Sequence, residues 1–585
     1  MDPQEEYSTR RENWTARERL GQQRFIRIGN ARLAVGLIAA PMIWLVFVRD
    51  LFSVLWLLVP LALFVSLIVW HQRVLRERDL AGRAIRYYAR GLMRFRDEWA
   101  GAVGETGERF RQSAHVYSED LDLFGKGSLF EMLSTARTAA GEDALAAWLL
   151  EPSSIAIVLA RQEAVKELRE KLDLREAISL SGDEVRAGMD AESLGRWGSL
   201  VPVNFPAVLR WLAPGLVIAG VLTLTAYFID LLPLWPLLLT LLCDFTVIFA
   251  TRRQVAAITG AVESPGSDLN VLVLLLERLE REHFESPLLR ESLAFLPVSQ
   301  RVRHLKRWVE LLDSSEHVLM RVIGPLLLWR QQIAMRIEAW RQKTGSGIGD
   351  WIRAVGEFEA LSSIAALAFE RPEWSFPELV DGTPALFEAS ALRHPLLPRA
   401  KCVPNDVTLN TAARLLIVSG SNMSGKSTLL RSIGLNCALA WAGAPVAVDR
   451  LRVAPLRMGA SIRTTDSLQY NRSRFLAEIL RIRQIVGLIR QDDAVLFLLD
   501  ELLSGTNSHD RLIGASGIVR GLLAGNSIGL LTTHDLALTQ IESGENVHFE
   551  DSIQDGELEF DYKLRPGIVT HGNALALMRA VGLEV

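Results

Sequence analysis

The pattern of apolar and polar residues shows two long uncharged runs near the start of the chain. Leu33 to Val48 is almost wholly apolar, and Leu51 to Trp70 is 20 residues without a charge. A helix needs roughly 20 apolar residues to cross the hydrocarbon core of a bilayer, with about 17 as the lower limit. The second run meets this length, and the first needs Gly29 to Arg32 to complete it. We therefore expect a transmembrane helical hairpin over residues 33–70.

A second pair of apolar runs follows later. It occupies Leu209 to Ile229 and Leu231 to Ala250, with Asp230 in the turn and Asp244 near the end of the second run. The length predicts another transmembrane hairpin over residues 209–250, with Asp244 at the interface. For the first hairpin, a pair of buried core helices is the alternative, which the length of the uncharged runs disfavours.

The flanking charges predict the orientation of both hairpins. Residues 1–32 form an Arg-rich tail that is too long to be the charged start of a secretory signal. Arginines also follow the second run, and Arg252 and Arg253 follow the fourth. Because basic residues stay on the cytoplasmic side, we expect the tail and every soluble part in the cytoplasm.

The rest of the chain has ordinary amphipathic patterns. Residues 72–200 and 255–375 repeat apolar residues at helical spacing, which is typical of packed helical domains. Within the second stretch, Gln300 to Trp308 is a basic run with an aromatic residue. It has the chemistry to contact nucleic-acid phosphates or anionic lipids, but a solvated helix face is the preferred interpretation. From about Ala385, short apolar strands alternate with helices, which predicts a mainly parallel α/β sheet in residues 385–585.

Composition adds limits to this picture. The 585 residues carry a formal net charge of −4, so no global basic signature for nucleic acid exists. Mean hydropathy is +0.18, which agrees with membrane segments. The three cysteines, Cys243, Cys402 and Cys437, have no metal-ligand spacing and form no disulfide framework, which fits a reducing compartment.

One glycine-rich stretch indicates nucleotide chemistry. A short apolar run at residues 415–418 is followed by the spacing G-x-x-x-x-G-K-S, and a helical pattern comes next. This is a P-loop, in which backbone N–H groups surround phosphates, Lys426 reaches the β- and γ-phosphates and Ser427 supplies a hydroxyl to Mg²⁺. The predicted nucleotide-binding residues are Gly420, Ser421, Asn422, Met423, Ser424, Gly425, Lys426, Ser427 and Thr428.

Two further segments carry residues suited to ATP hydrolysis. The apolar run at 494–499 ends in Asp500 and Glu501, a Walker B arrangement in which Asp500 holds Mg²⁺ and Glu501 orients the attacking water. The run at 528–533 ends in His534, which is placed to sense the γ-phosphate. We therefore predict Glu501, His534 and Lys426 as catalytic residues, with Ser427 and Asp500 as metal ligands.

This order of motifs resembles the ABC-type ATPases, and within them the MutS family of DNA mismatch repair proteins. Residues 420–428 look like the family's GPNMGGKST, with Ser421 for Pro and Ser424 for Gly. Further matches are Arg393-His394-Pro395, Val403-Pro404-Asn405-Asp406, Met458 to Ser461, Ser473 to Glu478, Asp500-Glu501-Leu502 and Thr532-Thr533-His534. The resemblance implies that Ser473 begins the signature helix, which contacts nucleotide in the partner subunit. It extends more weakly to residues 115–200, which look like the family's helical core.

Other features depart from the family. In the family, a mismatch-reading domain with a Phe-x-Glu wedge precedes the helical core. In this chain, an Arg-rich tail and a membrane hairpin stand in its place, and the connector domain is missing. The stretch between the lever helices is short, which leaves a reduced DNA clamp. Cys402 replaces the aromatic residue that stacks on adenine. Mismatch-specific recognition is therefore not expected.

Taken together, these patterns predict a multi-domain chain. It would have a helical core and lever region, two transmembrane hairpins, and a C-terminal α/β P-loop NTPase domain of the ABC type. We expect an ATPase that uses ATP and Mg²⁺ to change conformation, and a homodimer through the ATPase domains because the signature helix acts in trans. We also expect a multi-pass location in the inner membrane if the source is bacterial, and DNA binding without mismatch specificity.

The alternative is an ABC-class membrane ATPase or transporter-like protein that acts on a partner other than DNA. The chain has no LSGGQ-type signature, and only 80 positions separate Gly420 from Asp500, which disfavours a transporter. A non-hydrolysing scaffold is disfavoured by the intact Lys426 and Glu501.

Overall fold

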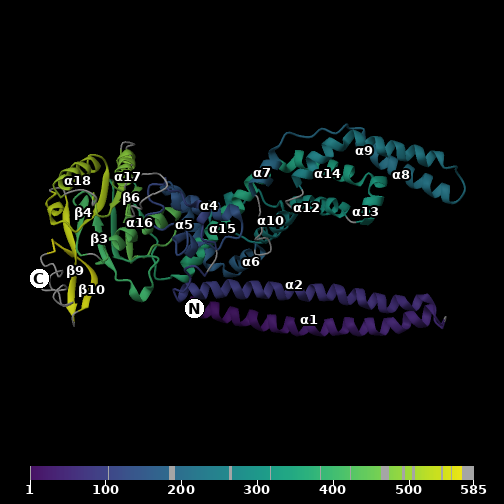
Figure 1. Cartoon of the computed structure of the whole chain (residues 1–585), viewed down its shortest axis with the longest axis horizontal. Coiled ribbons are helices and arrows are strands. Elements are labelled where there is room, and N and C mark those ends of the chain that lie inside the picture. The colour runs from purple at the N-terminus through teal and green to yellow at the C-terminus, as the bar shows by residue number, and fades with distance from the viewer. Residues whose placement is uncertain are drawn as a thin grey trace. The chain divides into compact units, whose positions relative to one another are not determined.

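The chain forms two compact units. Unit 1 comprises Met1–Leu133, Ala366–Ala440 and Ala444–Val585, and unit 2 comprises Ser134–Ala365 and Trp441–Gly443 (Figure 1). The computed structural model describes residues 2–49, 51–102, 105–182, 191–262, 266–316, 318–381, 384–421, 423–462, 474–489, 494–503, 508–541, 544–554 and 557–569. The predicted combination of a helical N-terminal part and a C-terminal α/β part is confirmed. The unit boundary at Leu133, however, divides the predicted 72–200 domain between the two units.

The helices of unit 1 include two long N-terminal ones and three that flank the main sheet. They are α1 (Pro3–Phe47), α2 (Leu58–Phe95), α3 (Leu129–Leu133), α16 (Lys426–Ala442), α17 (Arg474–Ile489) and α18 (Ser508–Leu523). The helices of unit 2 are α4 (Ala139–Leu150), α5 (Ile155–Glu170), α6 (Leu172–Gly182), α7 (Ala191–Ser199), α8 (Leu209–Phe228), α9 (Trp235–Val262), α10 (Gly266–Leu279), α11 (Pro287–Ser292), α12 (Ser299–Asp313), α13 (Val318–Ile323) and α14 (Trp329–Thr344). Helix α15 (Ile348–Glu370) belongs mostly to unit 2 and ends in unit 1.

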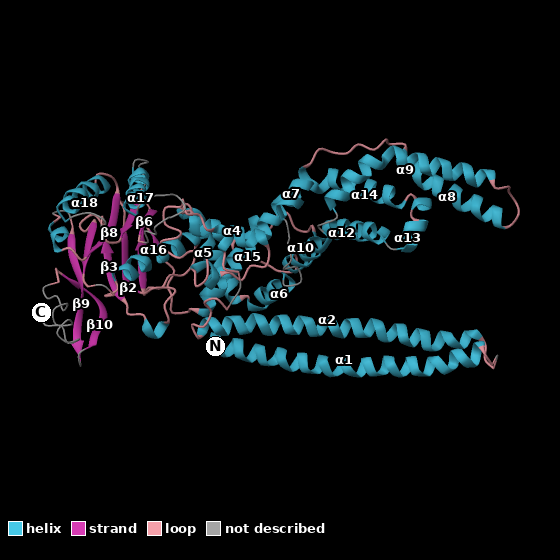
Figure 2. Ribbon diagram, in the orientation of Figure 1, coloured by secondary structure: helices cyan, strands magenta, loops and turns pink. Residues whose placement is uncertain are grey.

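The first hairpin consists of α1 and α2, which pack along each other (Figure 2). The Arg-rich tail is itself part of α1, which runs without interruption from Pro3 to Phe47. Close packing continues to the base of the hairpin, where a side chain on Gly91 would collide with the ring of Tyr7. The second predicted run begins with a 3-10 turn, Val54–Leu57, and becomes α-helical only at Leu58.

The second hairpin consists of α8 and α9 in unit 2. Pro236 lies in the first turn of α9, where a helix tolerates proline. Asp244 is buried within the protein, and its predicted place at a membrane interface stays a prediction. Glu338 and Arg341 of α14 form a buried ion pair at 2.9 Å, which holds the segment before α8 in place. Arg341 donates to the carbonyls of Trp197 and Leu200 at 3.2 and 2.8 Å.

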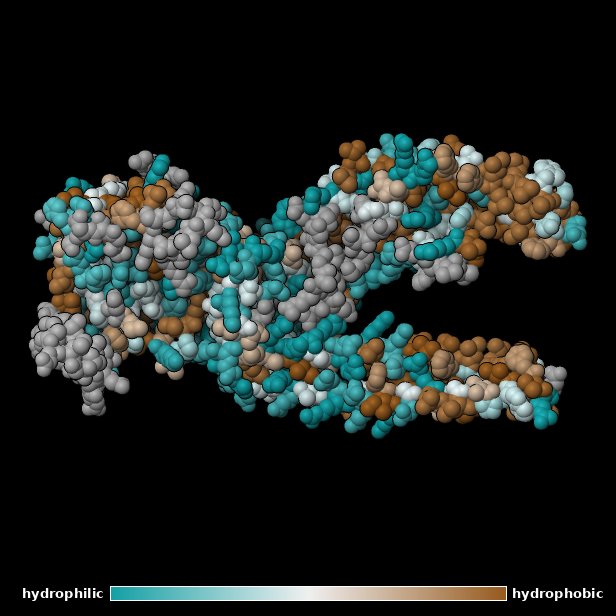
Figure 3. Space-filling view, in the orientation of Figure 1, coloured by the Kyte–Doolittle hydropathy of each residue, from teal (hydrophilic) through white to brown (hydrophobic). Residues whose placement is uncertain are grey.

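Among the residues that the structure describes, four helices are long and apolar enough to cross a membrane. They are α1, the helical segment Val54–Phe95, α8 and the segment Trp235–Gly260 of α9. In each, at most 17% of the most apolar 18-residue window is buried within the protein. Brown apolar surface covers the turn-proximal part of each hairpin in Figure 3. Such exposed apolar surface is far larger than a water-facing helix normally shows.

The main sheet of unit 1 has the strand order β10-β9-β4-β8-β7-β6. Its strands are β4 (Leu415–Ser419), β6 (Arg457–Ser461), β7 (Val495–Leu499), β8 (Ser527–Thr533), β9 (Glu545–Gln554) and β10 (Glu557–Pro566). All neighbours pair in parallel except β10, which is antiparallel to β9. Strands β4, β7 and β8 are buried along their whole length, which explains their continuous apolar sequence. The predicted mainly parallel sheet is therefore confirmed.

Helices cover both faces of this sheet and fix its position. On one face, α17 and α18 pack against alternate residues of the strands, including Ile417, Phe497 and Leu531. On the other face, α16 packs closely against β7. A Cβ atom added to Gly434 of α16 would lie 3.1 Å from the side chain of Leu498 of β7. A smaller sheet, β1-β5-β2-β3, comprises β1 (Glu378–Leu379), β2 (Phe387–Leu392), β3 (Asn405–Leu409) and β5 (Arg450–Val453).

Candidate nucleotide site

The site is built where the central strand β4 ends and α16 begins. Because parallel strands end at one edge of a sheet, the loops after β4, β7 and β8 meet there. The loop after β4 carries the glycine-rich motif, the turn after β7 carries Asp500 and Glu501, and the segment after β8 carries His534. The structure thus brings together three segments that are far apart in the sequence.

The glycine-rich loop requires its glycines. Gly420 has φ +151°, and a Cβ there would lie 2.8 Å from the Ser424 hydroxyl and 3.1 Å from the Phe549 carbonyl oxygen. Gly425 has φ +103°, and Met423, with φ 70°, is 86% exposed. Asn422 lies outside the described residues. These left-handed positions turn the loop sharply before α16, as a phosphate-binding loop needs.

Lys426 is buried in this loop. Its ammonium group donates to the carbonyls of Gly420 and Ser421, at 2.8 and 2.7 Å. Burial lowers the pKa of Lys426, and the nearby carboxylates of Glu501 and Asp500 partly oppose this effect. The hydroxyls of Ser421 and Ser424 are also buried, and neither has a hydrogen-bond partner within the described part of the chain. The loop therefore presents a cation and two unused hydroxyl groups, which suit an anionic oxygen-rich ligand.

Asp500 and Glu501 are positioned through Thr532 of β8. The Thr532 hydroxyl donates a short hydrogen bond to Asp500, and it accepts one from the Glu501 N–H at 3.1 Å. Glu501 has φ 46°, a conformation that costs energy for a non-glycine residue and is held here by this contact. Its carboxylate lies 3.6 Å from Nδ1 of His534, and both side chains are partly exposed.

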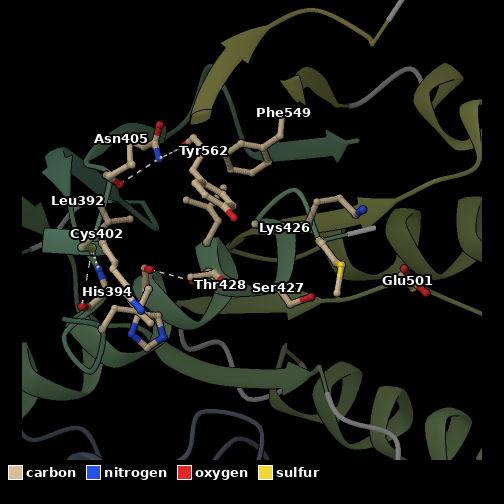
Figure 4. Close-up of a pocket in the computed structure, with 17 residues that line it drawn as sticks. Leu392, His394, Cys402, Asn405, Lys426, Ser427, Thr428, Glu501, Phe549 and Tyr562 are labelled. Atoms are coloured by element: carbon tan, nitrogen blue, oxygen red, sulfur yellow. Dashed lines mark hydrogen bonds between the residues drawn. The ribbon is translucent and has the colours of Figure 1, made fainter. Parts of the chain in front are cut away.

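A cavity of about 660 Å³ adjoins the glycine-rich loop (Figure 4), and Glu501 lines it, whereas Asp500 and His534 are not among its described lining residues. Lys426, Ser427, Thr428 and Glu501 line one part of it. The remaining walls come from β2, β3, β9, β10 and the segments between them: Leu392, His394, Leu397, Lys401, Cys402, Val403, Asn405, Phe549 and Tyr562. The cavity therefore has a polar part at the glycine-rich loop and a mixed aromatic and apolar part beyond it.

The aromatic wall of the cavity was missed by the sequence interpretation. Tyr562, with φ 53°, lies close over the loop, since a Cβ on Gly425 would be 3.3 Å from its ring. Asn405 fixes the strand that carries it, donating to the Tyr562 carbonyl at 2.9 Å and accepting from the Leu564 N–H at 2.7 Å. The signal available in the sequence was the pair Phe560 and Tyr562 in a run that alternates apolar and charged residues, and their rings stack 5.8 Å apart.

His394 forms part of the opposite wall. Burial lowers its pKa to about 4, and the neighbouring positive charge of Arg431 acts in the same direction. Its Nδ1 accepts a hydrogen bond from the Leu396 N–H at 3.2 Å, which requires that nitrogen to be unprotonated. Burial also raises the pKa of the Cys402 thiol. His394 and Cys402 are therefore both neutral at this end of the cavity, where the cationic Lys401 also lines the wall.

The comparisons with known proteins concern the same part of the chain. Residues 416–584 match MutS domain V. MutS domain V thus covers the glycine-rich loop, the turn after β7 and the segment after β8.

Curated relatives extend this similarity. The Endonuclease MutS2 of Thermomicrobium roseum is 30% identical over 289 residues, which are 47% of this chain and 35% of that protein. The DNA mismatch repair protein MutS 2 of Halobacterium salinarum is 32% identical over 240 residues, 40% of this chain and 27% of that protein. The matched parts thus span about a third of each relative's length. Together with MutS domain V, they support a relationship to the MutS family.

Besides Asn422, a second predicted site residue is not described. Ser473, expected to begin the signature helix, lies outside the described residues, and α17 is described from Arg474. Glu478 of α17 is buried and accepts a hydrogen bond from the Leu503 N–H at 2.6 Å. This contact ties α17 to the turn that carries Glu501.

Proposed function

We propose that this protein is a membrane-anchored ATPase of MutS type. The observation that carries the proposal is the cavity in which buried Lys426 and the carboxylate of Glu501 share one wall at the end of β4. The match to MutS domain V supports ATP as the nucleotide. In this arrangement, ATP phosphates lie at the glycine-rich loop and replace the two carbonyl contacts of Lys426.

The aromatic part of the cavity suits the nucleobase. Tyr562 offers a ring face and Phe549 adds apolar surface. His394, being neutral, avoids a positive charge beside an uncharged base. This assigns to Tyr562 the stacking function that the sequence interpretation missed when it found Cys402 in place of an aromatic residue.

Mg²⁺ fits the oxygen donors at this edge of the sheet. The Ser427 hydroxyl and the Asp500 carboxylate are the ligand types that the ion prefers, and together they would hold it. When bound, the ion supplies positive charge that neutralises phosphate oxygens. Thr532 orients Asp500 for this role, Glu501 orients or deprotonates the attacking water, and His534 hydrogen-bonds near the γ-phosphate.

The anchoring in a membrane rests on the four candidate spans and on the arginines that flank them. We propose a multi-pass protein with both units on the cytoplasmic side. Membranes that carry the full chain test this. The protein should remain in the pellet after high-salt and alkaline extraction, and its release by either treatment would contradict anchoring.

The names of the relatives suggest that DNA is the partner of the ATPase cycle. We propose DNA binding with little preference for a mismatch, and a homodimer closed through the ATPase domains. Binding of matched, mismatched and branched duplexes to the detergent-solubilised protein, at stated salt, tests the DNA partner. A clear preference for mismatched over matched duplex would contradict the proposed lack of mismatch reading.

Nucleotide binding tests the site itself. A fluorescent ATP analogue should bind the full-length protein and be displaced by ATP. Lys426→Met should weaken binding at least tenfold. Equal binding by wild type and this variant would show that the glycine-rich loop is not the nucleotide site.

A further inference from the structure

A second cavity lies entirely in unit 2, beside the candidate span α8. It has a volume of about 610 Å³ and shares no lining residue with the nucleotide cavity. The residues that matter for its chemistry are Val217 of α8, His304, Arg307 and Trp308 of α12, and Trp329 and Arg336 of α14. The cavity therefore joins the basic run of residues 300–308 to a predicted membrane helix.

The ionisable side chains that line this cavity are all basic. Two arginines and a histidine line it, and none of its described lining residues is acidic. Within the described part of the chain, neither Arg307 nor Arg336 forms an ion pair. The guanidinium of Arg336 lies over the ring of Trp308, 4.5 Å from its centroid, a contact that leaves its N–H donors unused.

Other basic residues of the same run interact with neighbouring side chains. Arg303 pairs with Glu277, and Lys306 donates to Asn270 at 2.7 Å and lies 3.5 Å from Glu310. The helix thus uses some of its basic residues for packing against neighbours and presents others to the cavity. Arg301, Arg303, His304 and Arg307 are exposed, as expected for a solvated helix face, and His304 and Arg307 of this face also line the cavity.

The surroundings of the cavity are apolar on the side of the hairpin. Beyond Val217, the α8 residues Ile218, Val221 and Leu222 are 53 to 64% exposed. The turn Pro325–Leu327 packs against α8 and α9, and nearby Val322 is 70% exposed. Tryptophans with basic residues at the edge of an apolar band are typical of the level of lipid headgroups. Long arginine stems can cross this edge while their charges stay in the polar layer.

We propose that this cavity binds the headgroup of an anionic phospholipid, whose acyl chains lie along the exposed face of α8. The arginines and His304 attract the phosphate, and the tryptophans flank the glycerol region. The inference rests on the proposed membrane insertion of the α8–α9 hairpin. Nucleic-acid phosphate has the same charge, but the continuous apolar surface from Val217 onward suits an acyl chain and not a sugar–phosphate backbone.

The test uses the full-length protein in detergent, after its resistance to alkaline extraction has been established. Short-chain phosphatidylglycerol is titrated and binding is followed by thermophoresis, with phosphatidylcholine, inorganic phosphate and a short DNA duplex as comparisons. Arg307→Gln, Arg336→Gln and the double variant are compared with Arg301→Gln, an exposed residue of the same helix that does not line the cavity. Melting temperatures check that each variant folds.

Phosphatidylglycerol should bind at least tenfold more tightly than phosphatidylcholine. Each cavity variant should weaken binding about fivefold and the double variant about 25-fold, whereas Arg301→Gln should change it less than twofold. Equal binding of both lipids, or no effect of the single variants, would overturn the site. Displacement by the duplex or by inorganic phosphate at similar concentration would also overturn it. If lipid binding fails in this way while the protein stays in the membrane, the lipid site is wrong but the proposed ATPase function is not affected.

Discussion

A buried ion pair at the base of the first hairpin gives a prediction that can be worked out from the structure. Arg94 of α2 and Glu370 at the end of α15 have side chains that are only 7% and 2% exposed. Two parallel hydrogen bonds of 2.6 and 2.5 Å join them, and the Tyr7 hydroxyl of α1 donates to the same carboxylate at 3.3 Å. One carboxylate thus joins three helices of unit 1.

Removing one charge should cost more than removing both. Glu370→Leu leaves the Arg94 guanidinium buried without a counter-charge, which destabilises by about 3–5 kcal/mol, and Arg94→Met does the same to the carboxylate. With about 2.1 cal/mol/K per residue over the roughly 350 residues of unit 1, each single variant should melt about 4–7 °C lower. The double variant removes both desolvation penalties, so it should melt higher than either single variant.

Thermal unfolding of the full-length protein in detergent, followed by tryptophan fluorescence, measures these shifts. Glu108→Gln is the control, because it breaks the exposed pair with Arg111, which is worth at most about 1 kcal/mol. A double variant whose loss equals the sum of the two single losses would refute the reasoning, since additive losses mean that the two side chains contribute independently of each other.

Three further predictions concern the nucleotide cavity. The pKa of His394 is held near 4 in the folded protein, against 6.5 in the unfolded chain, so the unfolded chain binds the proton more readily between these values. The neutral imidazole therefore contributes about 3 kcal/mol to the free energy of unfolding above pH 6.5, and this contribution is lost as the pH falls toward 4. Melting curves from pH 7.5 to 4.5 should therefore fall more steeply for wild type than for His394→Asn, and parallel curves would contradict this. Tyr562→Ala should weaken ATP binding about tenfold but leave inorganic triphosphate binding unchanged, whereas equal losses for both ligands would argue against stacking. Asp500→Asn should abolish the dependence of ATP binding on Mg²⁺ in a titration of the fluorescent analogue, and an unchanged dependence would exclude Asp500 as a ligand.

The sequence was most informative where a local pattern determines the structure. The buried strand before Gly420, the helix after Lys426 and the apolar strand before Asp500 are all set by short-range periodicity, so they could be located from the sequence. The four apolar helices were visible for the same reason. The predicted roles of the loop residues remain predictions, because they concern ligands.

Features set by long-range packing could not be located in this way. Tyr562 reaches the loop only because β10 pairs with β9, which lies beside β4. Thr532 acts on Asp500 and Glu501 because β7 and β8 are neighbours in the sheet. The helical form of the Arg-rich tail depends on its packing along α2, which its polar composition did not reveal.

Turnover of ATP by the purified full-length protein tests the central claim most directly. Wild type and the control Glu108→Gln should release phosphate from ATP only when Mg²⁺ is present. Glu501→Gln should bind the fluorescent analogue as wild type does but release phosphate at least 100-fold more slowly, because the carboxylate that orients or deprotonates the attacking water is lost. Absence of turnover by wild type, with or without DNA, would contradict the account, as would an unchanged rate for Glu501→Gln.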